Sequence, residues 1–421
     1  MTLYRTRVLR GAGLTRDPEF LKLWVGETVS DFGDQITLLA IPLTAVIVLH
    51  ANAIEMGLLG AVATAPTALF SLPVGVWVDR WPRRRVLLVA NLGRALVLAT
   101  VPAAFALGVL GLVHLYVAAF VTGTLSVFFI VAYQAYLPGL VGREKLVDAN
   151  SKMLATASVA QLAGPSVAGV LVQLFTAPLP VVVDAASFLV SFLGISLIRR
   201  DEPPVSPRRR DMVAEIREGM TALLGQPILR TLVMCSGIFI LLLSAQTAIF
   251  LLYLSRDLGL APAVIGLILA AGGVGALGGA LLASSVARRL GIGPSFIAGA
   301  FLVSGLFITR GLVGGSAEAI VVSLAVGQTI GFFGASLFNV NGPSLRQALT
   351  APALLGRVNA SYRFLVWGTG PFGALLGGAL GEILGLRIAL LVTGLASLAV
   401  FPILFTSPLP KIREVPAPQA A

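Results

Sequence analysis

The sequence predicts an all-helical membrane protein with twelve transmembrane helices, arranged as two pseudo-symmetric bundles of six. Three observations lead to this fold class. Of the 421 residues, 57% are hydrophobic and only 12% are charged, whereas about a quarter of the residues in soluble domains are charged. The apolar residues form runs long enough to cross a bilayer, and the basic residues gather in loops between them. Short segments of the first half also recur, in the same order, in the second half.

Each predicted span is a run of about 20 mostly apolar residues, the length that crosses a hydrocarbon core roughly 30 Å thick. Six runs fall in the first half, at residues 21–48, 56–77, 86–107, 113–135, 154–174 and 178–198. Six more fall in the second half, at residues 228–253, 262–286, 294–313, 317–338, 360–381 and 386–405. The stretch before the first run is basic and polar and lacks a short apolar core, so we expect no cleavable signal peptide.

The net charge of +11 comes from 30 Lys and Arg residues against 19 Asp and Glu residues. When the loops are assigned to alternate sides, the second side receives only Arg256, Arg310 and Arg387. By the positive-inside rule, we expect a multi-pass protein of the cytoplasmic membrane with both termini in the cytoplasm. Because the basic residues mark loops between spans, we expect contact with membrane lipid and no nucleic-acid partner. We also expect a monomer.

One long polar segment separates the two sets of spans. The predicted parts are a first bundle at residues 1–198, a cytoplasmic linker at 199–226, a second bundle at 227–406 and a cytoplasmic tail at 407–421. Three prolines in residues 201–210 prevent a continuous helix in the first part of the linker. In residues 211–224, apolar side chains recur at helical spacing, which predicts a short amphipathic helix at the membrane surface.

The two predicted bundles share local sequence. The matching pairs are residues 75–85 with 279–289, 134–135 with 347–348, 149–151 with 358–360, and 164–169 with 370–373. Repetition of one six-span unit is common in secondary transporters, whose substrate site lies at the interface between the repeats.

The first predicted span carries three acidic residues, Glu27, Asp31 and Asp34. Their spacings of four and three residues place them on one face of a helix, over about 10 Å. Each ionised carboxylate near the membrane centre costs on the order of 2.5–3.5 kcal/mol, and desolvation and mutual repulsion favour the protonated form. We expect Asp34 to carry the proton or bind a cationic substrate, with Asp31 the second candidate and Glu27 a candidate gate residue. Pairing with a basic residue is the structural alternative.

Four other polar residues lie inside predicted spans. We expect Arg94 to pair with a carboxylate or several carbonyl groups, and Asp184 to act as a cap or an ion-pair partner. Gln246 and Gln328 are equally consistent with hydrogen bonds to a substrate and with bonds between helices. The single Cys235 and two histidines give no metal-ligand spacing, and no phosphate-binding glycine loop is present. We therefore expect no metal, no cofactor and no enzymatic activity.

At residues 75–84 the chain resembles the major facilitator superfamily. The segment is similar to the superfamily signature Gly-x-x-x-Asp-Arg-x-Gly-Arg-Arg, with Gly75, Asp79, Arg80, Arg83 and Arg84 in place and Pro82 where glycine is usual. Gly164, Pro165 and Gly169 resemble the antiporter motif that marks exporters within the superfamily.

Three shorter segments, residues 30–34, 184–189 and 357–360, are similar to the branch of the superfamily that contains enterobactin exporters and macrolide efflux proteins. Many proton-coupled exporters carry an arginine in the fourth span. The fourth predicted span here, residues 113–135, contains none.

The resemblance implies the major facilitator fold and a secondary transporter that works by alternating access. We expect a proton-coupled exporter of amphipathic small molecules such as drugs or siderophores, with the proton gradient as its energy source. The signature loop is implied to close the cytoplasmic side in the outward-open state, with Asp79 at the start of the eleventh span, where the helix dipole is positive. The alternatives are an uptake carrier or facilitator for a small nutrient, and a non-transporting membrane receptor or enzyme.

Overall fold

The computed structural model describes residues 14–71, 73–78, 80–200, 202, 212–352 and 354–414. Asp79 of the signature loop, the proline-rich part of the linker and the end of the predicted tail lie outside these residues.

Eleven helical segments in the described chain are long and apolar enough to cross a membrane, and one shorter apolar helix makes the twelfth. The first half contains α1 (Pro18–Leu43), α2 (Ala53–Phe70), the short α3 (Pro73–Val78), α4 (Arg83–Ala106), α5 (Leu112–Val141), α6 (Leu146–Phe175) and the shorter helix α7 (Val181–Ser196). The second half contains α8 (Met212–Gly225), α9 (Pro227–Leu252), α10 (Pro262–Leu290), α11 (Ile292–Leu312), α12 (Ala317–Ala348), α13 (Leu355–Trp367) with α14 (Gly370–Leu384), and α15 (Leu386–Ala396) with α16 (Val400–Thr406). The predicted set of twelve membrane helices is confirmed.

Several helices differ from the predicted spans at one end. Helix α6 begins at Leu146 and α12 continues to Ala348, because polar residues extend these helices beyond their apolar parts. The second predicted span is divided, since α2 ends at Phe70 and α3 begins at Pro73, whose ring fixes its backbone and removes a donor.

The repeat seen in the sequence is also a repeat of helix packing. In the first half, neighbouring helices follow the order α2, α5, α4, α7, α1, α6, and in the second half they follow α10, α12, α11, α15, α9, α14. In both halves this is the order second, fourth, third, sixth, first and fifth span. Both first spans also end in a π-helical turn, at Thr44–Val48 and Tyr253–Asp257.

The two halves meet where α6 packs on α10 and α2 packs on α14. A Cβ atom at Gly169 would lie 2.4 Å from the carbonyl oxygen of Pro262, and one at Gly266 would lie 2.3 Å from that of Pro165. Likewise, a Cβ atom at Gly57 would lie 2.7 Å from the Cα atom of Gly378. Only glycine allows these backbones to approach so closely.

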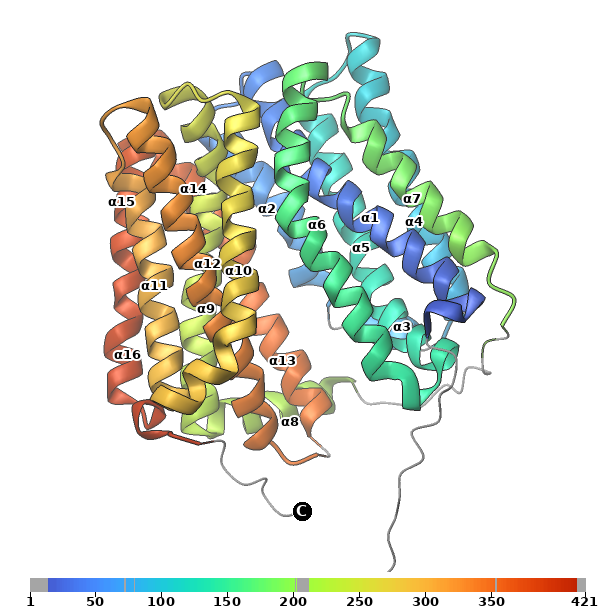
Figure 1. Cartoon of the computed structure of the whole chain (residues 1–421), viewed down its shortest axis with the longest axis vertical. Helices are drawn as coiled ribbons and strands as arrows, with labels where there is room; N and C mark the ends of the chain where they lie inside the picture. Colours follow the sequence, from blue (N-terminus) through green and yellow to red (C-terminus); the bar gives the residue numbers. More distant parts are fainter. Residues whose placement is uncertain are drawn as a thin grey trace, which may run out of the picture.

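We call the end of the molecule where α1 and α9 begin the basic end, and the other end the opposite end. In the described chain, the hydrogen bonds that join the two halves lie at the opposite end, from Arg256 Nη2 to the Ala51 carbonyl (3.0 Å) and from the Ala263 amide to Gln173 Oε1 (3.2 Å). One apolar cluster there draws side chains from both halves, whereas each half has its own cluster toward the basic end. The ribbons of the two halves diverge toward the basic end (Figure 1).

The amphipathic helix expected in the linker is present as α8 (Met212–Gly225). It packs against α13 and the start of α9, with Leu223 fully buried. A Cβ atom at Gly219 would lie 2.6 Å from the Arg357 carbonyl oxygen, and Glu218 forms an ion pair with the Arg357 guanidinium. This helix therefore belongs structurally to the second half (Figure 1).

Candidate functional site

A buried chain of hydrogen bonds joins three helices of the first half. Arg94 of α4 is only 4% exposed, and its guanidinium donates to Asn91 Oδ1. Asn91 Nδ2 donates to Ser191 Oγ of α7 (2.8 Å), and Ser191 Oγ donates to Glu27 Oε1 of α1 (2.5 Å). The sequence predicts a carboxylate or several carbonyl groups as partners of Arg94. Its direct partner is instead the side-chain amide of Asn91, and the Glu27 carboxylate is reached through Asn91 and Ser191.

Aromatic rings complete the surroundings of this guanidinium. The Arg94 Cζ atom lies 4.4 Å from the ring centre of Phe129 and 4.0 Å from that of Phe188. Cation–π contacts of this kind favour a charged side chain most when water is excluded.

Acidic side chains from two helices surround the same guanidinium. The positive charge of Arg94 acts on Asp34 and Glu27 from α1 and on Asp184 from α7. Asp184 is fully buried and accepts a hydrogen bond from Ser187 Oγ (3.0 Å), and a Cβ atom at Gly33 would lie 2.4 Å from Asp184 Oδ1. The structure therefore brings Asp184, which the sequence indicated only as a cap or pairing residue, into the carboxylate cluster.

The three acidic residues of α1 have different environments. Glu27 is buried against α7, Asp31 is half-buried and the Asp34 side chain keeps exposed surface. Asp31 and Asp34 also repel each other. Three carboxyl groups, those of Glu27, Asp34 and Asp184, thus share one guanidinium, so the cluster can hold protons without creating excess positive charge.

A second buried arginine corrects the sequence-based topology, which counted Arg310, near the end of the predicted span 294–313, with the outer side. Arg310 lies inside α11 and is only 3% exposed. Its guanidinium donates to Gln246 Oε1 (3.1 Å) and Gln328 Oε1 (3.0 Å) and lies 4.3 Å from the ring centre of Phe250. The side chain stays inside the bundle because two amide oxygens and an aromatic ring replace its water.

Gln246 and Gln328 both form hydrogen bonds between helices in this conformation. Gln246 is fully buried and donates through Nε2 to the carbonyl oxygens of Phe307 (3.0 Å) and Leu390 (3.1 Å). Gln328 is 1% exposed and accepts from Arg310. Both amides therefore join helices rather than line a cavity, which is the interhelical alternative.

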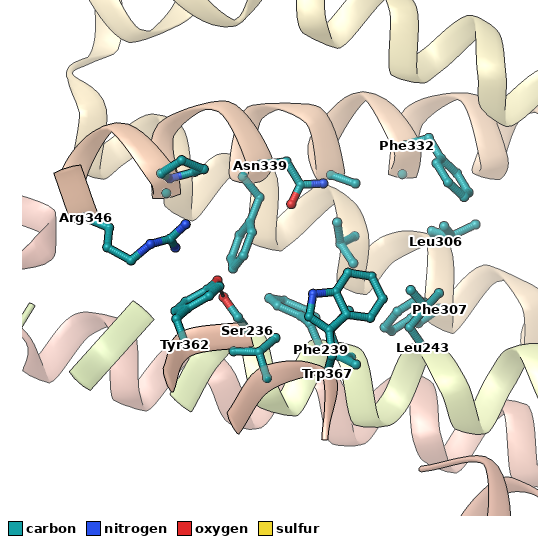
Figure 2. Close-up of a pocket in the computed structure, with 18 residues that line it drawn as sticks. Ser236, Phe239, Leu243, Leu306, Phe307, Phe332, Asn339, Arg346, Tyr362 and Trp367 are labelled. Atoms are coloured by element: carbon teal, nitrogen blue, oxygen red, sulfur yellow. Dashed lines mark hydrogen bonds between the residues drawn. The ribbon is translucent and has the colours of Figure 1, made fainter. Parts of the chain in front are cut away.

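A cavity of about 200 Å³ lies in the second half, between α9, α11, α12 and α13. Its walls are mainly apolar and include the aromatic side chains of Phe239, Phe307, Phe332, Phe338 and Trp367. Figure 2 shows Arg346 and Tyr362 at one end of the cavity and Leu306, Phe307 and Phe332 at the other. The cavity thus has a polar end and an apolar end.

The polar end of this cavity is held in place by hydrogen bonds. Arg346 Nε donates to Asn359 Oδ1 (2.6 Å), and the guanidinium lies 4.0 Å from the ring centre of Tyr362. The Tyr362 hydroxyl donates to Ser236 Oγ (2.7 Å). Arg346 lies beyond the tenth predicted span, residues 317–338, and the sequence gave no sign of this cavity.

The signature loop makes contacts within the first half in this conformation. The backbone amides of Arg83 and Arg84 donate to the Glu202 carboxylate (2.9 and 3.2 Å), and Arg83 also forms an ion pair with Glu202 (3.5 Å). Arg84 Nη2 donates to the Ser196 carbonyl (2.6 Å), and Arg80 is exposed. Gly75 has open space where a Cβ atom would be. Among the described residues, these arginines are not paired with the second half.

The three residues of the antiporter motif lie where α6 is packed most closely. Gly164 contacts Gln35 of α1, Pro165 supplies a carbonyl to the contact with Gly266, and Gly169 faces Pro262. The motif therefore forms part of the contact between halves. Within the described ranges, no three His, Cys, Asp or Glu side chains are placed to hold a metal ion.

The sequence matches a known family over nearly its whole length. A family model described as "Transmembrane secretion effector" matches residues 13–420. The multidrug efflux pump Tap of Mycolicibacterium fortuitum is 26% identical over 419 residues, which cover 95% of this chain and 97% of Tap. The enterobactin exporter EntS of Escherichia coli O127:H6 is 27% identical over 382 residues, which cover 87% of this chain and 86% of EntS.

Solved structures share the fold. The nucleoside transporter NupG aligns with a TM-score of 0.72 and 12% identity, covering 92% of this chain and 98% of NupG. A bacterial homologue of the iron transporter ferroportin, in an inward-facing state, aligns with a TM-score of 0.72 and 18% identity, covering 92% of this chain and 98% of the homologue. Both likenesses show the fold alone.

Because Arg310 donates hydrogen bonds to the amide oxygens of Gln246 and Gln328, we expect the protein to lose stability when one of these amides is removed. Gln328→Leu leaves an Arg310 donor buried without its acceptor, so the free energy of unfolding should fall by about 1–3 kcal/mol. Denaturant unfolding of the purified protein in detergent measures this. Gln347→Leu, at an exposed position of the same helix, is the control and should change stability little. Equal stability of the two variants would contradict the conclusion that Gln328 stabilises the buried Arg310 side chain.

Proposed function

We propose that this chain, which belongs to the transmembrane secretion effector family of major facilitator transporters, is a proton-coupled exporter of amphipathic small molecules. It is a multi-pass membrane transporter rather than an enzyme. One observation carries the proposal: the first half gathers carboxyl groups around Arg94, while the second half holds an aromatic cavity with Arg346 at its polar end. Proton and substrate thus have separate places in the two repeats.

The direction of transport rests on the relatives and on the distribution of charge. Tap is a multidrug efflux pump and EntS is an enterobactin exporter. The positive-inside rule places the basic end in the cytoplasm. In that orientation the halves are closed toward the outside and diverge toward the cytoplasm, the arrangement that admits a substrate from within the cell.

The carboxyl groups supply a route for proton coupling. Asp34 is exposed, so it can exchange a proton with water as the cavity opens to either side. A proton on Asp34 removes one negative charge that acts on Arg94, and this shifts the attraction of the guanidinium toward Glu27 and Asp184. Arg94 and Glu27 are linked through Asn91 and Ser191. A shift of the Arg94 guanidinium therefore alters the hydrogen bonds that hold α1, α4 and α7 together.

The signature loop would act in the opposite conformation. When the cytoplasmic side closes, the second half approaches the loop at Gly75, Asp79 and Arg80. Arg83 and Arg84 would then exchange contacts with Glu202 and Ser196 for contacts across the halves. The amphipathic linker helix moves with the second half because it packs on α13.

The first test concerns the proton. Asp34→Asn keeps the size of the side chain but cannot take up or release a proton, so proton-linked transport should be lost while expression and folding are kept. Inside-out vesicles with a fluorescent pH probe report proton release when ethidium and a panel of amphipathic drugs are added. Asp148→Asn, at an exposed site paired with Lys152, is the control. Full proton-linked transport by Asp34→Asn would exclude this role, and uptake driven in the reverse direction would favour a nutrient carrier.

The second test concerns the cavity. An aromatic anion such as 8-anilinonaphthalene-1-sulfonate can place its rings among the phenylalanines and its sulfonate beside Arg346. Arg346→Gln should weaken its binding about tenfold or more, the loss expected for a charge-assisted hydrogen bond, and should affect ethidium much less. Equilibrium binding to the purified protein measures both dyes. Arg363→Gln, exposed on α13, is the control. Equal effects on anion and cation would contradict the assignment of Arg346.

A further inference from the structure

A second cavity, of about 250 Å³, lies at the basic end of the first half, apart from the cavity of the second half. It is formed by the start of α4, the end of α5, and the segments that follow α5 and α7. We call it the arginine pocket because Arg83, Arg143 and Arg200 all line it, together with Glu202, the one acidic residue among the described residues of its lining. The pocket is several times larger than the roughly 30 Å³ that one water molecule occupies in the liquid.

The arginine pocket contains donors that the protein does not use. Tyr136 is only 4% exposed, and its hydroxyl is buried without a hydrogen-bond partner among the described residues. The Nε atom of Arg83 is likewise buried and unpartnered within the described chain. Buried polar groups are nearly always satisfied by protein or by another bound molecule, so a molecule in this cavity, water or a ligand, would supply the partner of both donors.

The charges of the pocket identify what it would accept. Glu202 is already engaged by the backbone amides of Arg83 and Arg84. Arg200 donates to the Leu140 carbonyl and forms an ion pair with Asp17 (3.3 Å). The Arg143 side chain makes no hydrogen bond or ion pair with any residue that the structure describes. The pocket therefore retains positive charge and free donors, and none of the described residues that line it offers a free carboxylate.

We propose that the arginine pocket binds a phosphate group, held by Arg83 Nε, the Tyr136 hydroxyl and the Arg143 guanidinium. Phosphate oxygens match this set because guanidinium groups bind them through charge-assisted hydrogen bonds. The pocket lies at the end of the helices, among the basic loops, where the phosphates of anionic lipids are found. The phosphate can belong to a lipid headgroup or be free in solution. In either case it ties the start of α4 to the end of α5 and, through Glu202, to the segment after α7.

The test measures binding to the full-length protein in detergent after delipidation. Dioctanoyl phosphatidylglycerol and inorganic phosphate are titrated separately at constant ionic strength, and native mass spectrometry counts the bound molecules. Tyr136→Phe and Arg143→Gln should each weaken binding about tenfold. Tyr133→Phe removes a hydroxyl that is also buried and unpartnered on α5 but lies outside the pocket, and it should not change binding. Arg289→Gln, exposed on α10, controls for the loss of one charge.

The outcomes separate the two sources of phosphate. Binding of phosphatidylglycerol alone, with the expected loss in both variants, identifies a lipid headgroup site. Binding of both ligands with the same losses identifies a site for free phosphate as well. The proposal is overturned if neither ligand binds. It is also overturned if the ligand that binds the unaltered protein binds Tyr136→Phe and Arg143→Gln just as tightly. Because Tyr136→Phe changes one hydroxyl, its unliganded melting temperature shows whether the fold is kept.

Discussion

The backbone contact between the two halves is the constraint on which the rest of the structure depends. At Gly169 and Gly266, and again at Gly57 and Gly378, no side chain fits between the helices. The halves are therefore held together tightly at the opposite end, and their apolar cores merge there. Toward the basic end each half keeps its own core. A contact without interlocking side chains is also one that two rigid bundles can leave and re-form.

The two repeats use the same position for different chemistry. Arg94 and Arg310 both lie buried in the third span of their half. Carboxyl groups act on Arg94, so its surroundings change whenever a proton is gained or lost. Neutral amides hold Arg310, so its surroundings keep the same charge. The first half is thus suited to respond to protons, and the second half to present a fixed aromatic cavity.

Much of the fold could be predicted from the sequence because membrane spans and basic loops are patterns along the chain. The three acidic residues of α1 were found in the same way. Arg310 was counted with the outer side because hydropathy does not distinguish an arginine at the end of a span from one whose side chain is buried between the helices. The cavity could not be predicted, since Ser236, Arg346 and Tyr362 meet only through the packing of three helices. Asp184 joined the cluster for a similar reason, because α7 lies against Gly33.

The central claim is that the halves separate at the opposite end during each cycle, and a disulfide across that end tests it most directly. In a Cys235→Ala background, Gly60→Cys with Ala248→Cys joins α2 to α9, where the Cβ atoms would lie 3.5 Å apart. Gly327→Cys with Thr309→Cys, also 3.5 Å apart, joins two helices of one half. These separations suit a disulfide. Oxidation should stop transport in vesicles for the first pair, with recovery on reduction, and should leave the second pair active. Full transport by the oxidised first pair would contradict the account.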